Sequence, residues 1–237
     1  MRRLITVLVV LVLIVVAADR LIVWFAERTI AEQIQKTAEL TDRPDVSVRG
    51  FPFITQALRG HYREMDVALT DPAVDGGLKI DSLDIRLRGV RITLSDAANR
   101  RVDTVPVDEA TAVARVSFAS LNAAAKQNLE GTRSSVEFAP GGEGNRLAVT
   151  GNYRSSGLSA KIDAEAVLTT QDGDLIVELA PEALNGIPRP IRQQVSSVLK
   201  KASRLPDLPY GFQAKSVTVQ PSGVSVQATS STLDLHR

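Results

Sequence analysis

Residues able to do acid–base or nucleophilic chemistry are few in this 237-residue chain. It has no cysteine, which excludes thiolate metal sites and a cysteine nucleophile, and its two histidines, His61 and His236, lie far apart. No Gly-x-Ser-x-Gly nucleophile turn or metal-binding histidine pair occurs. Carboxylate pairs such as Asp108–Glu109 arise by chance among 27 acidic residues, although two carboxylates suffice for hydrolysis. We therefore predict that the protein is not an enzyme and uses no cofactor or metal.

The charge balance gives no indication of a nucleic-acid partner. Lys and Arg number 28 and Asp and Glu 27, a net charge of +1, so no basic surface for phosphates is expected. Four basic residues fall in a predicted second helix: Arg192, Lys200, Lys201 and Arg204. They suit anionic lipid headgroups or a solvated helix end that complements the helix dipole, and we favour the second interpretation.

The N-terminus carries the clearest signal in the chain. Arg2 and Arg3 precede fifteen residues without charge, Leu4 to Ala18, a pattern typical of a secretory signal or a signal anchor. As a helix this run spans roughly 22 Å, less than the hydrocarbon core of roughly 30 Å. The small residues up to Ala18 suit signal peptidase, whereas apolar Leu21 to Ala26 extends the run into an uncleaved anchor. Both alternatives stay open.

With the two arginines inside, the rest of the chain is predicted to lie outside the cytoplasm. We expect a signal peptide or membrane anchor over residues 1–26 and a single domain over residues 27–237, at the cell membrane on its extracytoplasmic, periplasmic side. Residues expected to face the membrane in the first segment are Leu4, Leu8, Leu11, Ile14 and Trp24.

Two amphipathic helices are predicted within the domain. Apolar residues recurring every four positions predict the first over about residues 21–40: Ile22, Ala26, Ile30, Ile34 and Ala38. The second is predicted to begin near Pro190, with Val195 and Leu199 in its apolar stripe, and to end before Pro206. A shorter helix is predicted from an N-cap at Ser120 to about Leu129.

Strand-like alternation fills much of the remaining chain. In its cleanest run the apolar residues all point one way: Leu158, Ala160, Ile162, Ala164, Ala166 and Leu168. Asp172-Gly173 predicts a hairpin turn, and a phase slip predicts a bulge near Gly89. One dry and one wet face are typical of antiparallel sheets, so we expect an α+β fold with a bent antiparallel sheet. Its small side chains leave space for acyl chains or for a closely packed helix, and both interpretations stay open.

One segment is distinctive: residues 44–56 read PDVSVRGFPFITQ. Phe51 and Phe53 are two apart, so an extended segment places both on the same side, and Pro52 keeps it extended. Ile54 to Arg59 is predicted to form one short turn, ended by Gly60. The two rings either contact lipid at the end of a tunnel or anchor the first helix to the sheet, and we favour the anchor.

The Gly-Phe-Pro-Phe core followed by Thr-Gln resembles the LmeA-like family (lipomannan elongation factor A) of actinobacterial cell-envelope proteins. Other segments agree with this resemblance: Asp19-Arg20 after the apolar run, the helix start Ala26–Glu32, and Leu-Pro-Asp-Leu-Pro-Tyr-Gly-Phe at residues 205–212. The resemblance covers nearly the whole chain.

This resemblance implies several properties. Family members are exported, bind phospholipids, including lipids of the phosphatidylinositol type, and support elongation of mannose-containing glycolipids. Envelope glycosyltransferases are therefore expected partners. The family fold is similar to tubular lipid-binding proteins, in which a curled antiparallel sheet wraps a long helix around an acyl-chain tunnel. The resemblance implies no catalytic residues in this chain.

We predict a membrane-held protein that binds or shuttles phospholipid in an apolar tunnel. The residues expected to contact lipid are Ile30, Ile34, Phe51, Phe53, Leu158, Ile162, Val195 and Leu199. One alternative is an anchored scaffold for envelope enzymes without a lipid ligand, which an exposed apolar patch beside a filled core would favour. Another is a weak hydrolase, which converging carboxylates in a cleft would favour.

Overall fold

The computed structural model describes residues 2–37, 40–72, 79–93, 96, 104–130, 134–155, 158–179 and 211–234. Its longer helices are α1 (Arg2–Thr37), α2 (Phe53–Arg59) and α4 (Phe118–Asn128). Its strands are β1 (Asp45–Arg49), β2 (His61–Thr70), β3 (Ser82–Arg91), β4 (Thr104–Ser117), β5 (Ser135–Pro140), β6 (Arg146–Ser155), β7 (Leu158–Gln171), β8 (Asp174–Leu179), β9 (Gln213–Gln220) and β10 (Gly223–Asp234).

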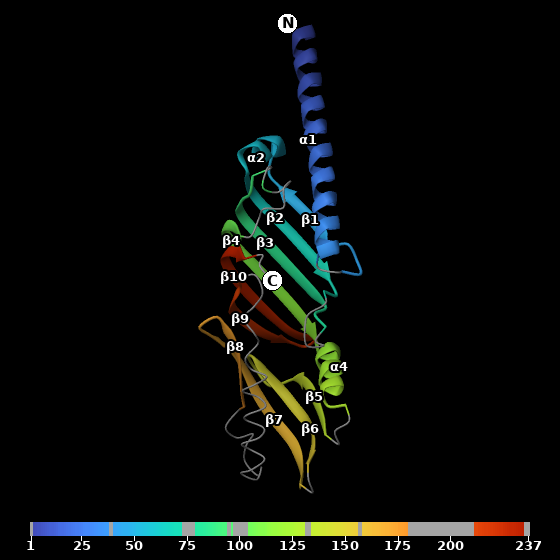
Figure 1. Cartoon of the computed structure of the whole chain (residues 1–237), viewed down its shortest axis with the longest axis vertical. Coiled ribbons are helices and arrows are strands. Elements are labelled where there is room, and N and C mark those ends of the chain that lie inside the picture. The colour runs from blue at the N-terminus through green and yellow to red at the C-terminus, as the bar shows by residue number, and fades with distance from the viewer. Residues whose placement is uncertain are drawn as a thin grey trace. The chain divides into compact units, whose positions relative to one another are not determined.

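The strands form two open sheets, one in the order β1-β2-β3-β4-β10-β9 and one in the order β5-β6-β7-β8 (Figure 1). The pairs β1–β2, β5–β6, β6–β7, β7–β8 and β9–β10 are antiparallel, which confirms an α+β fold with antiparallel sheets. The chain divides into two compact units: unit 1 comprises residues 1–69, 84–110 and 231–237, and unit 2 comprises residues 70–83 and 111–230. The single domain expected over residues 27–237 stays a prediction.

Helix α1 packs on unit 1 through a row of residues that is one position out of phase with the predicted stripe. Val23 and Ala31 are buried, whereas Ile22 is 44% exposed. Glu27 lies in the same row, where its carboxylate accepts a 2.7 Å hydrogen bond from the backbone N–H of Val48 in β1. Because Glu27 interrupts the buried row, that row does not look apolar in the sequence. The prediction therefore followed the regularly spaced isoleucines of the neighbouring row.

The strands of unit 1 in the six-stranded sheet have the alternation that the sequence predicts. Val46 of β1 pairs with Val67 of β2, and both side chains are buried. On the solvent face, the Asp66 carboxylate forms ion pairs with the Nε atoms of Arg49, at 2.7 Å, and of Arg86, at 2.8 Å. Such exposed ion pairs contribute little stability, but they keep this face of three neighbouring strands wet.

The predicted phase slip at Gly89 is confirmed. Leu87 and Val90, three residues apart in β3, are both buried, which a regular strand does not allow. Gly89 adopts a φ of +60°, and a Cβ there would overlap the Asp108 carboxylate. Glycine is required because it tolerates both the left-handed backbone and the close approach.

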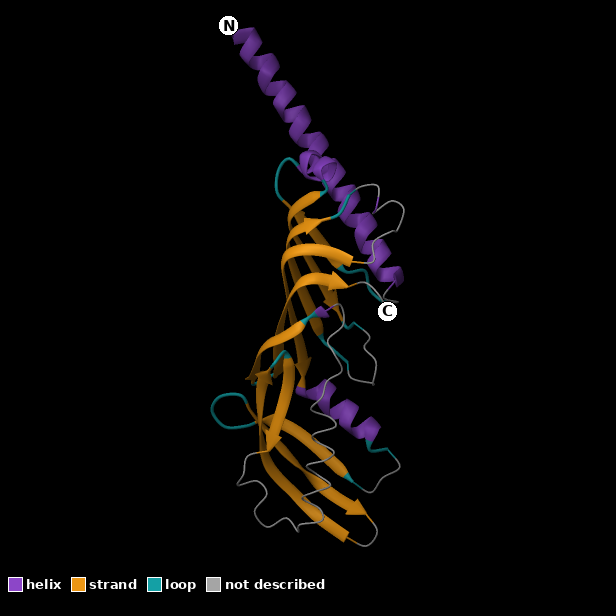
Figure 2. Cartoon of the chain, turned by 60° about the vertical axis from the view of Figure 1, so that its left-hand side comes forward, coloured by secondary structure: helices purple, strands orange, loops and turns teal. Residues whose placement is uncertain are grey.

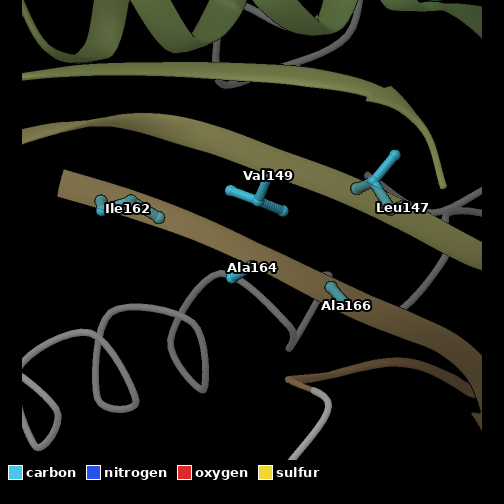
Figure 3. Packing of buried hydrophobic residues seen from close by; sticks show 5 residues of the cluster. All are labelled: Leu147, Val149, Ile162, Ala164 and Ala166. Carbon is cyan, nitrogen blue, oxygen red and sulfur yellow. The ribbon is translucent and has the colours of Figure 1, made fainter. Parts of the chain in front are cut away.

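Unit 2 contains a four-stranded meander with one apolar face. The central cluster comprises Leu147, Val149, Ile162, Ala164 and Ala166, from β6 and β7 (Figure 3). The meander turns from β7 into β8 at Asp172-Gly173, where both residues have positive φ (53° and 90°), as the predicted hairpin requires.

The outer edge of this sheet is covered by a side chain. Helix α4 lies beside β5, an edge strand (Figure 2). The Asn122 amide donates to the Phe138 carbonyl at 3.0 Å and accepts from the Phe138 N–H at 2.7 Å. One side-chain amide thus replaces a neighbouring strand and satisfies an exposed edge.

Helix α4 begins three residues earlier than the sequence predicts. Its N-cap is Ser117, whose hydroxyl accepts from the N–H of Ser120, so the predicted cap at Ser120 is wrong. The Asp81 carboxylate accepts hydrogen bonds from the N–H and hydroxyl of Ser117 and from the hydroxyl of Ser120. Asp81, which is distant in sequence, thus holds the N-cap serine in place, and this contact cannot be read from the local pattern.

The predicted second helix, with Val195 and Leu199, lies outside the described residues, as do its basic residues and most of the segment at 205–212.

Removing the Asp81 carboxylate is expected to destabilise unit 2. Asp81→Ala deletes the acceptor for three donors, and a buried polar group without a partner costs roughly 1–3 kcal/mol. Thermal unfolding in detergent, followed by circular dichroism, should occur at a lower temperature in this variant. The control is Asp163→Ala, an exposed carboxylate on β7, which should change stability by less than about 0.5 kcal/mol.

This contribution should depend on pH. Burial alone raises the pKa of Asp81, but hydrogen bonds from Ser117 and Ser120 outweigh burial and lower the pKa below its ordinary value. A lowered folded-state pKa gives stability that is present above the unfolded-state pKa and lost as pH falls through the folded value. The difference between wild type and Asp81→Ala should therefore shrink below about pH 4. A difference that stays constant down to about pH 2 would contradict this assignment.

Candidate functional site

The first half of α1 exposes apolar side chains on every side. From Leu4 to Val15 its leucines, isoleucines and valines are 48–77% exposed. Within the described chain, α1 is the one helix long and apolar enough to cross a membrane, over Arg2–Lys36. The predicted membrane-facing residues all lie on this exposed surface: Leu4, Leu8, Leu11, Ile14 and Trp24. The helix is thus a candidate membrane span or signal sequence.

The exposed apolar surface continues beyond Asp19 and Arg20, the charged pair that follows the uncharged run. Leu21, Ile22, Trp24 and Phe25 are exposed, Phe25 by 68%. Residues 4–25 therefore form an apolar surface about 33 Å long at 1.5 Å per residue. This length matches a hydrocarbon core of roughly 30 Å, which the uncharged run alone does not reach.

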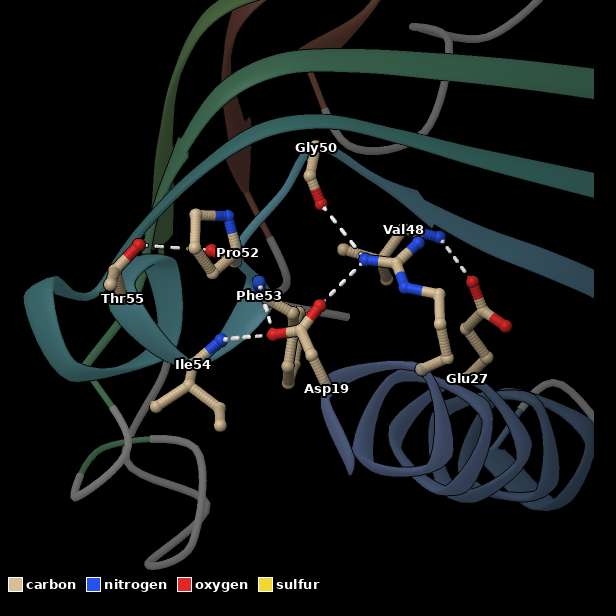
Figure 4. Close-up of polar contacts among 9 residues, drawn as sticks. Asp19, Glu27, Val48, Gly50, Pro52, Phe53, Ile54 and Thr55 are labelled. Atoms are coloured by element: carbon tan, nitrogen blue, oxygen red, sulfur yellow. Dashed lines mark hydrogen bonds and ion pairs between the residues drawn. The ribbon is translucent and has the colours of Figure 1, made fainter. Parts of the chain in front are cut away.

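Asp19 lies inside this apolar surface, yet its side chain is fully buried. One carboxylate oxygen accepts from the N–H groups of Phe53 at 2.7 Å and Ile54 at 3.2 Å, and the other accepts from Arg20 at 2.7 Å (Figure 4). Pro52, at the N-cap of α2, has no side-chain acceptor. Asp19 therefore caps α2 from a different helix and satisfies N–H groups that every helix start leaves free.

The remaining residues of the Gly-Phe-Pro-Phe-Ile-Thr-Gln segment build the same junction. Phe53 is 6% exposed and packs against Tyr62, with ring centroids 6.0 Å apart. Gln56 is also buried and accepts from the Arg63 N–H at 2.9 Å. Gly50 has a φ of +108°, and a Cβ there would lie 2.8 Å from the Gln56 amide nitrogen. The motif thus encodes a structural junction.

Burial also affects a titratable group of this junction. Tyr62 packs against Phe53 with tilted rings, and its burial raises the pKa of Tyr62 above its ordinary value. The neutral phenol therefore persists throughout the physiological range, so Tyr62 serves packing in this position and carries no charge.

The other face of α2 is open. Phe51 is 48%, Ile54 38% and Leu58 75% exposed. Phe51 and Phe53 therefore do not share one side, and the predicted pair of rings is wrong because Phe53 begins a helix instead of continuing an extended strand. Gly60 ends this helix in the left-handed conformation, as predicted.

The predicted lipid-contacting residues fall into separate groups. In unit 1, Ile30 and Ile34 are half-buried on α1, and Phe51 and Phe53 flank Pro52. In unit 2, Ile162 belongs to the apolar cluster and Leu158 begins β7. Val195 and Leu199 lie outside the described residues. Contact of these residues with lipid stays a prediction. Sequence reasoning noted Asp19 only as part of the Asp19-Arg20 pair of the resemblance and missed its role as the cap of α2.

Loss of the Asp19 carboxylate is expected to loosen α2. Asp19→Ala removes the acceptor for two backbone N–H groups, a change that costs about 1–2 kcal/mol for a helix cap. Hydrogen–deuterium exchange of peptides covering residues 51–60 should be faster in this variant. Asp42→Ala, which removes an exposed carboxylate of the same unit, should leave exchange there unchanged. Equal protection in both variants would refute the capping role.

Comparison with known proteins agrees with the resemblance carried by the Gly-Phe-Pro-Phe segment. The LmeA-like phospholipid-binding family matches residues 17–229. A search of curated proteins and a search of solved structures gave no significant match. The family match begins just before Asp19 and includes both the α1–α2 junction and the apolar face of β6 and β7. The chain therefore belongs to the LmeA-like phospholipid-binding family.

Proposed function

We propose that this protein is an extracytoplasmic phospholipid-binding protein of the cell envelope, anchored by α1, which holds or shuttles acyl lipids in an apolar tunnel. The observation that carries the proposal is the family match over residues 17–229. The proposed lipid is of the phosphatidylinositol type, and the proposed role is support of envelope mannan synthesis together with glycosyltransferases. The protein acts by binding and not by catalysis.

The exposed surface of α1 supports an uncleaved anchor. Cleavage after Ala18 would leave Leu21, Trp24 and Phe25 exposed at the start of the mature chain. An apolar patch of this kind is unfavourable in water but suits the bilayer and its interface. Arg2 and Arg3 favour the cytoplasmic side for the N-terminus, and the two units then lie on the opposite side.

The apolar face of unit 2 supports the lipid site. Leu147 pairs with Ala166 and Val149 pairs with Ala164, so longer side chains on β6 stand beside short ones on β7. Small side chains along β7 suit a long, narrow occupant such as an acyl chain or a helix, as in the tubular arrangement of a curled sheet around a helix. Each methylene transferred from water to this face contributes about 0.8 kcal/mol.

Photocrosslinking tests the lipid site separately from the anchor. The full chain is reconstituted in phosphatidylcholine vesicles that contain a phosphatidylinositol with a photoreactive acyl chain, and crosslinked peptides are identified by mass spectrometry. We expect adducts within residues 147–166 as well as on α1. Excess unlabelled phosphatidylinositol should reduce the unit 2 adducts more than excess phosphatidylcholine does. Adducts confined to α1 would contradict the proposal.

A matched pair of variants locates the lipid. Ala164→Leu adds bulk on the buried face of β7, and displacement of about two methylenes lowers occupancy roughly tenfold. Asp163→Leu places the same side chain on the exposed face of the same strand and should leave the adducts unchanged. Circular dichroism checks that both variants stay folded, since overpacking costs about 1–3 kcal/mol.

A membrane-anchored scaffold without a lipid ligand is the second candidate. The exposed apolar side chains of Phe51, Ile54 and Leu58 favour it, because such a surface suits a protein partner. Adducts confined to α1 in the photocrosslinking experiment would support this candidate.

A further inference from the structure

Three apolar side chains form an exposed surface on one side of the α2 junction. We call Phe51, Ile54 and Leu58 the outer face of α2. Ile54 and Leu58 are four residues apart and so lie on one face of the helix. Phe51 precedes the helix and is exposed as well. The opposite side of the helix is buried through Phe53 and Gln56. The outer face therefore plays no part in packing the described core.

The outer face is attached to α1 at a defined level. Asp19 holds the first two N–H groups of α2, and the Arg20 guanidinium lies 5.6 Å from the centre of the Phe51 ring. Arg20 also reaches the Gly50 carbonyl at 3.5 Å. Within unit 1, α2 lies beside the middle of α1, at the end of the unit nearest the N-terminal half of that helix (Figure 1).

The apolar surface of α1 extends past this level. From Asp19 to Phe25, the last of its exposed apolar residues, is six residues, or about 9 Å along the helix. If the bilayer covers the whole apolar surface, α2 lies near the boundary between acyl chains and headgroups. The Arg28 guanidinium lies 5.6 Å from the centre of the Trp24 ring. A tryptophan beside an arginine is typical of the boundary between acyl chains and headgroups.

The charges at this level are compatible with such a position. Asp19 is neutralised by Arg20 and has its oxygens bonded within the protein. The Arg20 guanidinium bonds to Asp19 and lies over the Phe51 ring, but its side chain is still 49% exposed, so it can also reach lipid phosphates. Isolated charges are costly in apolar surroundings, but this pair carries no net charge.

We propose that the outer face of α2 inserts into the bilayer next to α1, as a second, non-spanning membrane contact that sets the orientation of unit 1. The occupant of this face is the leaflet on the side of the two units. The proposal rests on the membrane anchoring proposed for α1. A spanning helix alone leaves the attached unit free to rotate and tilt, whereas two contacts joined through Asp19 restrict both motions.

Site-specific fluorescence on the full chain tests this contact. The sequence has no cysteine and one tryptophan, so Leu58→Cys gives a unique site for an environment-sensitive NBD label, and Trp24 reports on α1. Ala68→Cys, at an exposed position of β2 in the same unit, is the matched control. The protein is reconstituted in phosphatidylcholine–phosphatidylglycerol vesicles with and without doxyl-labelled phosphatidylcholine. Because Leu58 is 75% exposed, labelling removes no core contact.

We expect the label at position 58 to emit at shorter wavelength than the label at position 68 and to be quenched by the doxyl lipid, with Trp24 quenched in both proteins. Quenching of Trp24 without quenching at position 58 would overturn the outer-face contact while leaving the anchor intact. A blue shift at position 58 without lipid quenching would also overturn it, because the face would then be covered by protein. Absence of quenching at both positions would overturn the anchor as well.

Discussion

A carboxylate within an apolar helix is stable only where other groups of the protein satisfy it, and Asp19 meets this condition by joining α1 to α2. Its oxygens accept hydrogen bonds from the Arg20 guanidinium and from the N–H groups of Phe53 and Ile54. The start of α2 therefore depends on α1, and the position of α2 fixes which apolar side chains are buried and which are exposed. The exposed apolar surface of α1 and the packed junction share this one group.

Unit 2 uses the same principle with other residues. Asp81 holds Ser117, the N-cap of α4, and the side chain of Asn122 in α4 bonds to the backbone of the edge strand β5. Polar side chains from distant parts of the sequence thus close the backbone groups that helix ends and sheet edges leave open. The apolar face of β6 and β7 can then include the short side chains of Ala164 and Ala166, because it does not position α4 by itself.

These arrangements connect the family assignment to a physical account of lipid handling. The apolar surface of α1 has the length of a bilayer core and makes this helix a candidate membrane span or signal sequence. The cluster on β6 and β7 is the apolar surface on which we propose that acyl chains bind. Hydrophobic transfer is non-directional, so the proposed binding of acyl chains depends on apolar area and not on a particular polar group. It does need orientation with respect to the bilayer, and the α1–α2 junction is where unit 1 meets the helix proposed to anchor it.

The strand pattern, the hairpin at Asp172-Gly173 and the slip at Gly89 were predictable because alternation and glycine placement are local properties of the chain. The long apolar N-terminal helix was predictable as well, since it depends on composition alone. Only the tertiary structure decided which row of α1 is buried and that Ser117, not Ser120, caps α4. It also decided that Phe53 is buried while Phe51 is exposed. In each case the deciding hydrogen bond joins residues that are distant in sequence. Glu27 bonds to Val48, Asp81 to Ser117, and Asp19 to Phe53 and Ile54. Such pairings leave no periodic pattern in the sequence.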